Sequence, residues 1–118
     1  MHALLFAALL ATGATQPAEL DYSSGALAYQ ALVTGDLTLA ERQLVASQAA
    51  NRNDGAWLLN YGQLLARQGR VNEAREVFRQ VARAPDSEIV LASGEVMGTR
   101  EVSRIAARRL TQQSLSAR

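Results

Sequence analysis

An internal repeat of 34 residues constrains this 118-residue chain more than any other feature. Segments 21–54 and 55–88 align without a gap, and the matched positions agree more in side-chain size than in identity. The matched pairs are Leu27/Tyr61, Ala28/Gly62, Gly35/Gly69, Ala40/Ala74 and Leu44/Phe78. Self-similarity at a fixed period of this length is typical of repeat folds, in which each unit buries its apolar face against the next.

The matched positions suit a pair of packed helices in each segment. Gly35 and Gly69 suit the left-handed conformation that ends a helix. Small Ala40 and Ala74 suit the crossing of the second helix over the first, and the larger residue four positions later fills the space beside it. Apolar residues recur at intervals of three and four over 57–65 and 71–81, which is the spacing of one helix face.

Two polar residues predict where the second helix of each pair begins. Thr38 and Asn72 are aligned, and both residue types are good helix N-caps. Glu41 stands three residues after Thr38, which completes the spacing of a capping box.

This pattern resembles the tetratricopeptide repeat family. In the second segment Gly62, Gly69, Ala74 and Phe78 stand at the family's eighth, fifteenth, twentieth and twenty-fourth positions, whereas Leu58 replaces the usual Trp. The first segment is more degenerate, and the resemblance covers 68 of the 118 residues. It implies an all-α fold, a short solenoid of two helical hairpins; a generic pair of helical hairpins is the alternative.

The resemblance also implies a binding groove. First helices of successive repeats line a concave surface that holds peptides in this family, and the groove positions here are Tyr22, Tyr29, Asn60, Gln63 and Arg67. Stacking on tyrosine and hydrogen bonds from amide and guanidinium groups suit an extended peptide. For Tyr29, packing against a capping segment is an equally good interpretation.

The first 14 residues are typical of a secretory signal peptide. Residues 3–11 are uninterruptedly apolar, and small residues follow up to Ala14. The stretch is too short to span a bilayer, which takes about 20 residues. No Lys or Arg precedes it, so a buried N-terminal helix is the alternative. We expect a single bacterial domain over 15–118, periplasmic or secreted, without an integral membrane span.

The C-terminal part, 89–118, does not continue the repeat and is expected to cap it. Residues 88–91 favour a strand, and the turn dipeptide Ser93–Gly94 follows, which predicts a small β-hairpin over 88–97; an irregular loop is the alternative. A helix is predicted from Thr99 to about Leu115, with a cap's apolar face and polar face. Its apolar face comprises Val102, Ile105, Ala106 and Leu110, and its basic face Arg100, Arg104 and Arg108.

The composition argues against an active site. The chain has no Cys and no Lys, and its one His, His2, lies in the predicted signal. These absences exclude thiolate metal sites, Schiff-base chemistry and histidine acid–base catalysis in the mature chain. The carboxylate pair Glu73/Glu76 is explained by ion pairing with nearby arginines on one helix. We therefore predict no catalytic residue, no cofactor and no metal.

Charge is divided unevenly along a chain whose net charge is +1, which argues against nucleic acid as a partner. Residues 19–54 hold five acids against two Arg, whereas residues 99–118 hold five Arg against one Glu. The main hypothesis is an adaptor or scaffold that binds a peptide or protein in its groove. One alternative is a structural subunit that self-associates weakly through its acidic and basic ends. Another is an envelope-surface binder that uses the basic C-terminal helix.

Overall fold

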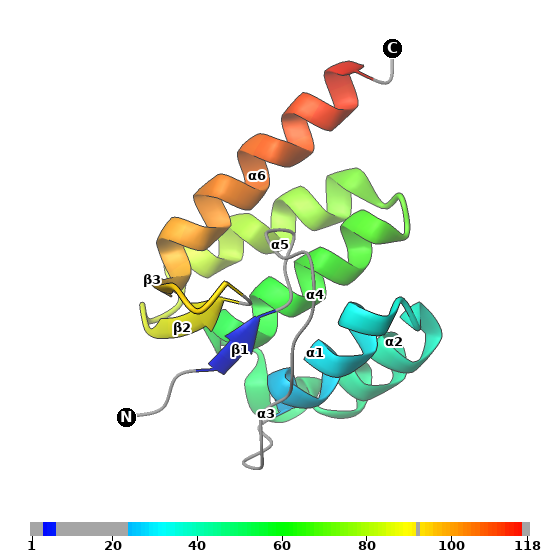
Figure 1. Ribbon diagram of the computed structural model, residues 1–118, viewed down its shortest axis with the longest axis vertical. Helices are drawn as coiled ribbons and strands as arrows, with labels where there is room; N and C mark the ends of the chain where they lie inside the picture. The colour runs from blue at the N-terminus through cyan, green and yellow to red at the C-terminus, as the bar shows by residue number, and fades with distance from the viewer. Residues whose placement is uncertain (1–3, 7–23, 92, 117–118) are drawn as a thin grey trace.

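The computed structural model describes residues 4–6, 24–91 and 93–116, and within these residues the chain is mostly helical, as predicted (Figure 1). Tyr22 and all of the predicted signal segment apart from Leu4–Phe6 lie outside the described residues. The elements are β1 (Leu4–Phe6), α1 (Ser24–Thr34), α2 (Leu37–Ala46), α3 (Gln48–Asn51), α4 (Gly55–Arg67), α5 (Val71–Arg83), β2 (Glu88–Leu91), β3 (Val96–Gly98) and α6 (Thr99–Ser116).

Two helical hairpins form the body of the molecule, and their second helices begin 34 residues apart. α1 packs on α2, and α4 packs on α5. Helix α4 is central, because α1 and α2 contact it on one side and α5 and α6 also contact it (Figure 1). The 34-residue repeat of the sequence therefore corresponds to a repeat of helical hairpins.

Glycine has the predicted roles in both hairpins. Gly35 and Gly69 end the first helix of each pair with φ of +83° and +81°, in the left-handed region that residues with a Cβ rarely adopt. Gly62 allows close packing, since a Cβ there would lie 2.4 Å from Cε1 of Phe78. Ala40 and Ala74 are fully buried, as the helix-crossing argument requires.

Both predicted N-caps were wrong by two positions. Asp36, not Thr38, caps α2, and its Oδ1 accepts a hydrogen bond of 3.0 Å from the Leu39 N–H. A charged carboxylate directly after the glycine interacts more favourably with the helix dipole than a hydroxyl does. Helix α5 follows Arg70 without a side-chain cap, so Asn72 lies inside the helix.

The joint between the two hairpins is built on Trp57, which is buried. Its indole Nε1–H donates to Oγ of Ser47 at 3.0 Å, and Ser47 lies between α2 and α3. One turn along α4, Tyr61 stacks on Trp57 with ring centroids 5.1 Å apart and planes at 25°. Trp57 thus ties the end of the first hairpin to the start of the second.

The predicted β-hairpin is confirmed, and the described residues add a third strand. β2 and β3 pair antiparallel through a turn in which Gly94 has a φ of +91°. β1 pairs with the other edge of β2, parallel to it, and the register aligns Leu5 with Val90. Ile89 and Leu91 of β2 are buried against the helices.

Helix α6 covers the second hairpin, as the capping prediction requires. Val102, Ala106 and Leu110 are buried, and α6 packs on α5 and α4. Oδ1 of Asp86 in the preceding loop accepts from the Arg100 N–H and from the Thr99 hydroxyl, both at 3.2 Å. These hydrogen bonds, together with the charges of Arg100 and Arg104, lower the pKa of Asp86. The loop carboxylate therefore caps α6.

Candidate functional site

Three of the predicted groove residues form one stripe along α4. Asn60, Gln63 and Arg67 are three and four residues apart, so they share a face of the helix. The side chains of Asn60 and Gln63 lie in the interior, with exposed fractions of 0% and 1%. Tyr29 of α1 is also buried, and this burial raises its pKa. Three of the described groove positions, Tyr29, Asn60 and Gln63, are therefore enclosed in this structure, whereas Arg67 is exposed.

Arg67 connects the two first helices. Its Nη1 donates a hydrogen bond to the carbonyl oxygen of Leu32 in the last turn of α1. A cation near the carboxyl end of a helix is favourable because it lies at the negative end of the helix dipole. Arg67 therefore holds α1 against α4 at the end of the predicted groove.

Gln63 is the most informative member of the stripe. Within the described part of the chain, neither its amide nitrogen nor its amide oxygen has a hydrogen-bond partner, although both atoms are buried. A buried polar group without a partner costs roughly 1–3 kcal/mol, and each such group in a folded protein calls for an explanation. An amide offers one acceptor and two donors, which is the complement of a peptide main chain.

Strand β1 packs on α4, the helix that carries this stripe. It contacts both α1 and α4 and adds to the edge of β2 (Figure 1). On β2, Leu91 N–H bonds to the Glu95 carbonyl on the β3 side. Because neighbouring residues of a strand point their main-chain groups in opposite directions, Val90 directs its N–H and C=O toward β1. The α1, α4 and β2 elements thus form a seat for an extended segment, which we call the strand seat.

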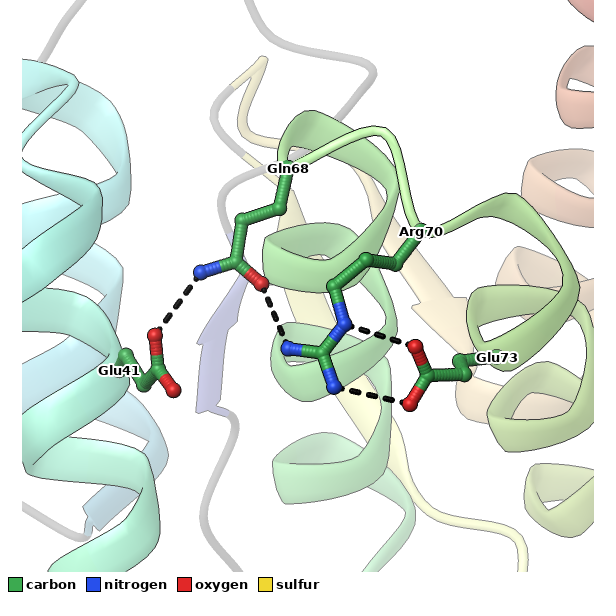
Figure 2. A network of polar contacts seen from close by, with 4 residues as sticks. All are labelled: Glu41, Gln68, Arg70 and Glu73. Carbon is green, nitrogen blue, oxygen red and sulfur yellow. Dashed lines mark hydrogen bonds and ion pairs between the residues drawn. The ribbon is translucent and has the colours of Figure 1, made fainter.

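A polar network fastens α2 to the turn between α4 and α5 (Figure 2). The Gln68 amide donates to Glu41 at 2.9 Å and accepts from Arg70 at 3.1 Å. Arg70 also holds Glu73 through two hydrogen bonds of 2.7 and 2.8 Å, which lower the pKa of Glu73. The sequence did not predict this network, because it joins residues of both repeats.

The described acids of the first hairpin all accept hydrogen bonds. Asp36 and Asp54 cap α2 and α4, and Glu41 accepts from Gln68. The acidic excess on which the self-association hypothesis depends is therefore explained in part by helix capping within the chain.

The predicted basic face divides into two parts. The Arg100 guanidinium donates to the Ala84 carbonyl at 3.0 Å, so Arg100 fastens the start of α6 to the end of α5. Arg104 and Arg108 instead line a cleft between α5 and α6, together with Arg75 and Arg79 of α5. Sequence reasoning missed the α5 pair because it assigned those arginines to ion pairing along the helix. The signal was the shared spacing of four residues within each pair.

Other classes of site find no support among the described residues. Residues 4–6, 24–91 and 93–116 contain no group of three or more His, Cys, Asp or Glu side chains arranged to hold a metal ion. None of the described helices combines the length and apolar character needed to cross a membrane.

Comparison with known proteins gives no direct indication of family. No protein-family model matches the chain, and neither curated proteins nor solved structures give a significant match.

Proposed function

We propose that the chain is a non-catalytic, exported interaction module, built on two tetratricopeptide-like repeats, that binds an extended segment of a partner protein in the strand seat. The observation that carries the proposal is the position of β1, an extended segment of the chain itself, between α1, α4 and the edge of β2.

The sequence of β1 connects this observation with export. Leu4–Phe6 lie within the signal segment predicted over 1–14. Cleavage after Ala14 removes β1 and leaves the main-chain edge at Val90 without its neighbour. An unpaired strand edge is a template for pairing with another chain. The mature protein is thus expected to accept a partner where the precursor holds its own strand.

The seat favours an extended, apolar peptide. Addition of a strand gains affinity from main-chain hydrogen bonds, whereas side-chain pockets give selectivity. Gln63 and Asn60 supply buried amides on α4, one of the two helices that β1 contacts. Because the seat is short, we expect micromolar affinity, equivalent to about 8 kcal/mol.

A peptide-binding experiment tests the proposal. The probe is a fluorescein-labelled peptide of residues 2–8 of this chain, and fluorescence anisotropy measures its binding to the chain starting at Thr15 and to the chain starting at Met1. We expect the Thr15 chain to bind at least about tenfold more tightly, because β1 competes for the seat in the longer chain; tenfold corresponds to about 1.4 kcal/mol.

The matched control is the same peptide with Pro at its positions for Leu5 and Phe6, which removes two main-chain donors. Hydrogen exchange supplies an internal reference, since the Val90 amide faces β1 and the Leu91 amide bonds to Glu95. Peptide binding should protect Val90 and leave Leu91 unchanged. Equal binding of both peptides, or no binding to the Thr15 chain, contradicts the proposal.

A further inference from the structure

The cleft between α5 and α6 combines an apolar floor with a cationic rim. Its volume is about 400 Å³, within the range of small-ligand sites. Phe78, Ala82 and Ala107 supply apolar surface, and Ser103 and Thr111 are its uncharged polar lining residues. Four arginines complete the lining, and no carboxylate is part of it. We call this site the arginine cleft.

Among the described residues, three of the four arginines form no ion pair with a carboxylate. Arg79 bonds to Glu76 at 2.8 Å. Arg75 donates to the neutral amide of Asn72 at 3.1 Å. Within the described residues, Arg75, Arg104 and Arg108 lie within ion-pair distance of no carboxylate. The cleft therefore keeps an excess of positive charge beside apolar atoms.

The two helices bring these arginines together in a regular way. Arg75 and Arg79 are one turn apart on α5, and Arg104 and Arg108 are one turn apart on α6. A guanidinium binds carboxylate or phosphate through two parallel hydrogen bonds, and its methylene stem adds apolar surface. An acidic group at the rim can thus be held from both sides.

We propose that the arginine cleft binds an anionic amphiphile, a small molecule that joins one acidic headgroup, phosphate or carboxylate, to an apolar chain. The headgroup lies among the four guanidinium groups, and the chain covers the two alanines beside Phe78. This activity is independent of the strand seat, which lies on the α1 and β2 side of α4.

The lining distinguishes this ligand from neighbouring classes. Stacked bases need aromatic platforms, and Phe78 is the one aromatic residue in the lining. Phe78 is itself 2% exposed and packs against Gly62, so it offers no stacking face. Membrane-surface helices present a broad apolar face, whereas the apolar residues Val102, Ala106 and Leu110 of α6 are buried in the protein.

The test uses the full chain and decyl phosphate below its micelle-forming concentration, with binding measured by calorimetry. Inorganic phosphate tests the headgroup alone, and decanol tests the apolar chain alone. We expect decyl phosphate to bind at least about tenfold more tightly than either fragment, because only it gains both kinds of contact. Equal affinity for inorganic phosphate, or for decanol, overturns the proposal.

Two variants and one control locate the site. Arg104→Gln/Arg108→Gln should weaken decyl phosphate binding at least about tenfold. Arg42→Gln/Arg52→Gln removes the same charge from exposed positions in the first repeat and should leave affinity within about twofold. Ala82→Trp should weaken binding by filling the cleft without a change of charge, since Ala82 is exposed and the fold tolerates a larger side chain there.

The Arg42→Gln/Arg52→Gln control separates binding in the cleft from general attraction to a positively charged protein. An equal loss of affinity in the Arg42/Arg52 control overturns the proposal, because it shows attraction to net charge. Binding to anionic phosphatidylglycerol vesicles without binding to monomeric decyl phosphate also overturns it, because it indicates a membrane surface as the target.

Discussion

The two helical hairpins share a 34-residue pattern but solve the same packing problem with different side chains. In the first hairpin, the positions equivalent to Gly62 and Phe78 are Ala28 of α1 and Leu44 of α2, and both are fully buried. In the second hairpin, Gly62 of α4 packs against Phe78 of α5, and no room is left for a Cβ at Gly62. A smaller residue on one helix accompanies a larger residue on the other. The repeat therefore keeps the volume of the pair, which is what close packing requires.

The hairpins also differ in what covers them. Helix α6 packs on α5 and buries the outer apolar side of the second hairpin. The first hairpin leaves Val33 and Val45 with exposed fractions of 40% and 54%. A terminal repeat needs a polar outer face or a cap, and the apolar side of the second hairpin is covered more completely than that of the first. We therefore expect mutations in the second hairpin to have the larger effects on stability.

Gly62→Ala should have the largest effect and tests the matched pair directly. Alanine is the better helix former by about 1 kcal/mol, yet its Cβ would collide with the Phe78 ring. We expect a net loss of roughly 1–3 kcal/mol in the free energy of unfolding, measured by urea denaturation. Phe78→Leu in the same chain should recover at least about 1 kcal/mol, since the double variant reproduces the first hairpin's pair. If the two substitutions lowered the free energy of unfolding additively, Gly62 and Phe78 would not be a size-complementary pair.

Gln63→Met should raise stability and lower binding. Methionine has nearly the shape of glutamine and removes two buried polar atoms that have no partner within the described residues. We expect a gain of about 1 kcal/mol in thermal or urea unfolding, together with weaker binding of the residue 2–8 peptide. The equivalent position in the first hairpin is Tyr29, so Tyr29→Phe is the control. A loss of stability in Gln63→Met would show that the Gln63 amide makes hydrogen bonds in the folded protein.

Asp36→Ala should destabilise α2 by about 1 kcal/mol, because it removes the N-cap. Thr38→Ala is the matched control within the same turn and should change the free energy of unfolding by less than about 0.5 kcal/mol. In the second hairpin, Asn72→Ala should also have little effect, since α5 lacks a side-chain cap. If Thr38→Ala cost more than Asp36→Ala, the α2 boundary would lie two residues later.

The smallest expected effect is a pH dependence at the start of α6. The pKa of Asp86 is lowered on folding, so its contribution to stability is present above the unfolded value of about 3.9 and is lost as the pH falls through the lower folded pKa. The Tm of the parent should exceed that of Asp86→Asn at pH 6, and the difference should shrink below about pH 4. Glu95→Gln, in the β2–β3 turn, is the control. A constant difference across this range would contradict ionic capping.

Much of the fold could be predicted because local chemistry decides it. Gly35 and Gly69 mark helix ends through their backbone freedom, and the apolar spacing of α4 and α5 marks their buried faces. The hairpin of β2 and β3 followed from a β-prone run and the turn glycine Gly94. These signals are confined to short stretches, so they can be read without knowledge of the partners.

The candidate sites were harder to predict because they depend on contacts between distant segments. Asn60 and Gln63 were predicted to face a groove, but their burial depends on neighbouring elements that the sequence pattern does not specify. Parallel pairing of β1 with β2 joins residues about 85 apart in sequence, and no local rule selects it. The arginine cleft likewise required the packing of α5 on α6.

Trp57 makes the molecule its own spectroscopic reporter. It is the only tryptophan in the sequence, it is 2% exposed, and its indole N–H bonds to Ser47 across the joint between the hairpins. Its fluorescence emission should be blue-shifted while the joint is closed and shift to the red when the hairpins separate. Separation of the hairpins can thus be followed by tryptophan emission, and loss of total helix content by circular dichroism, without an added label.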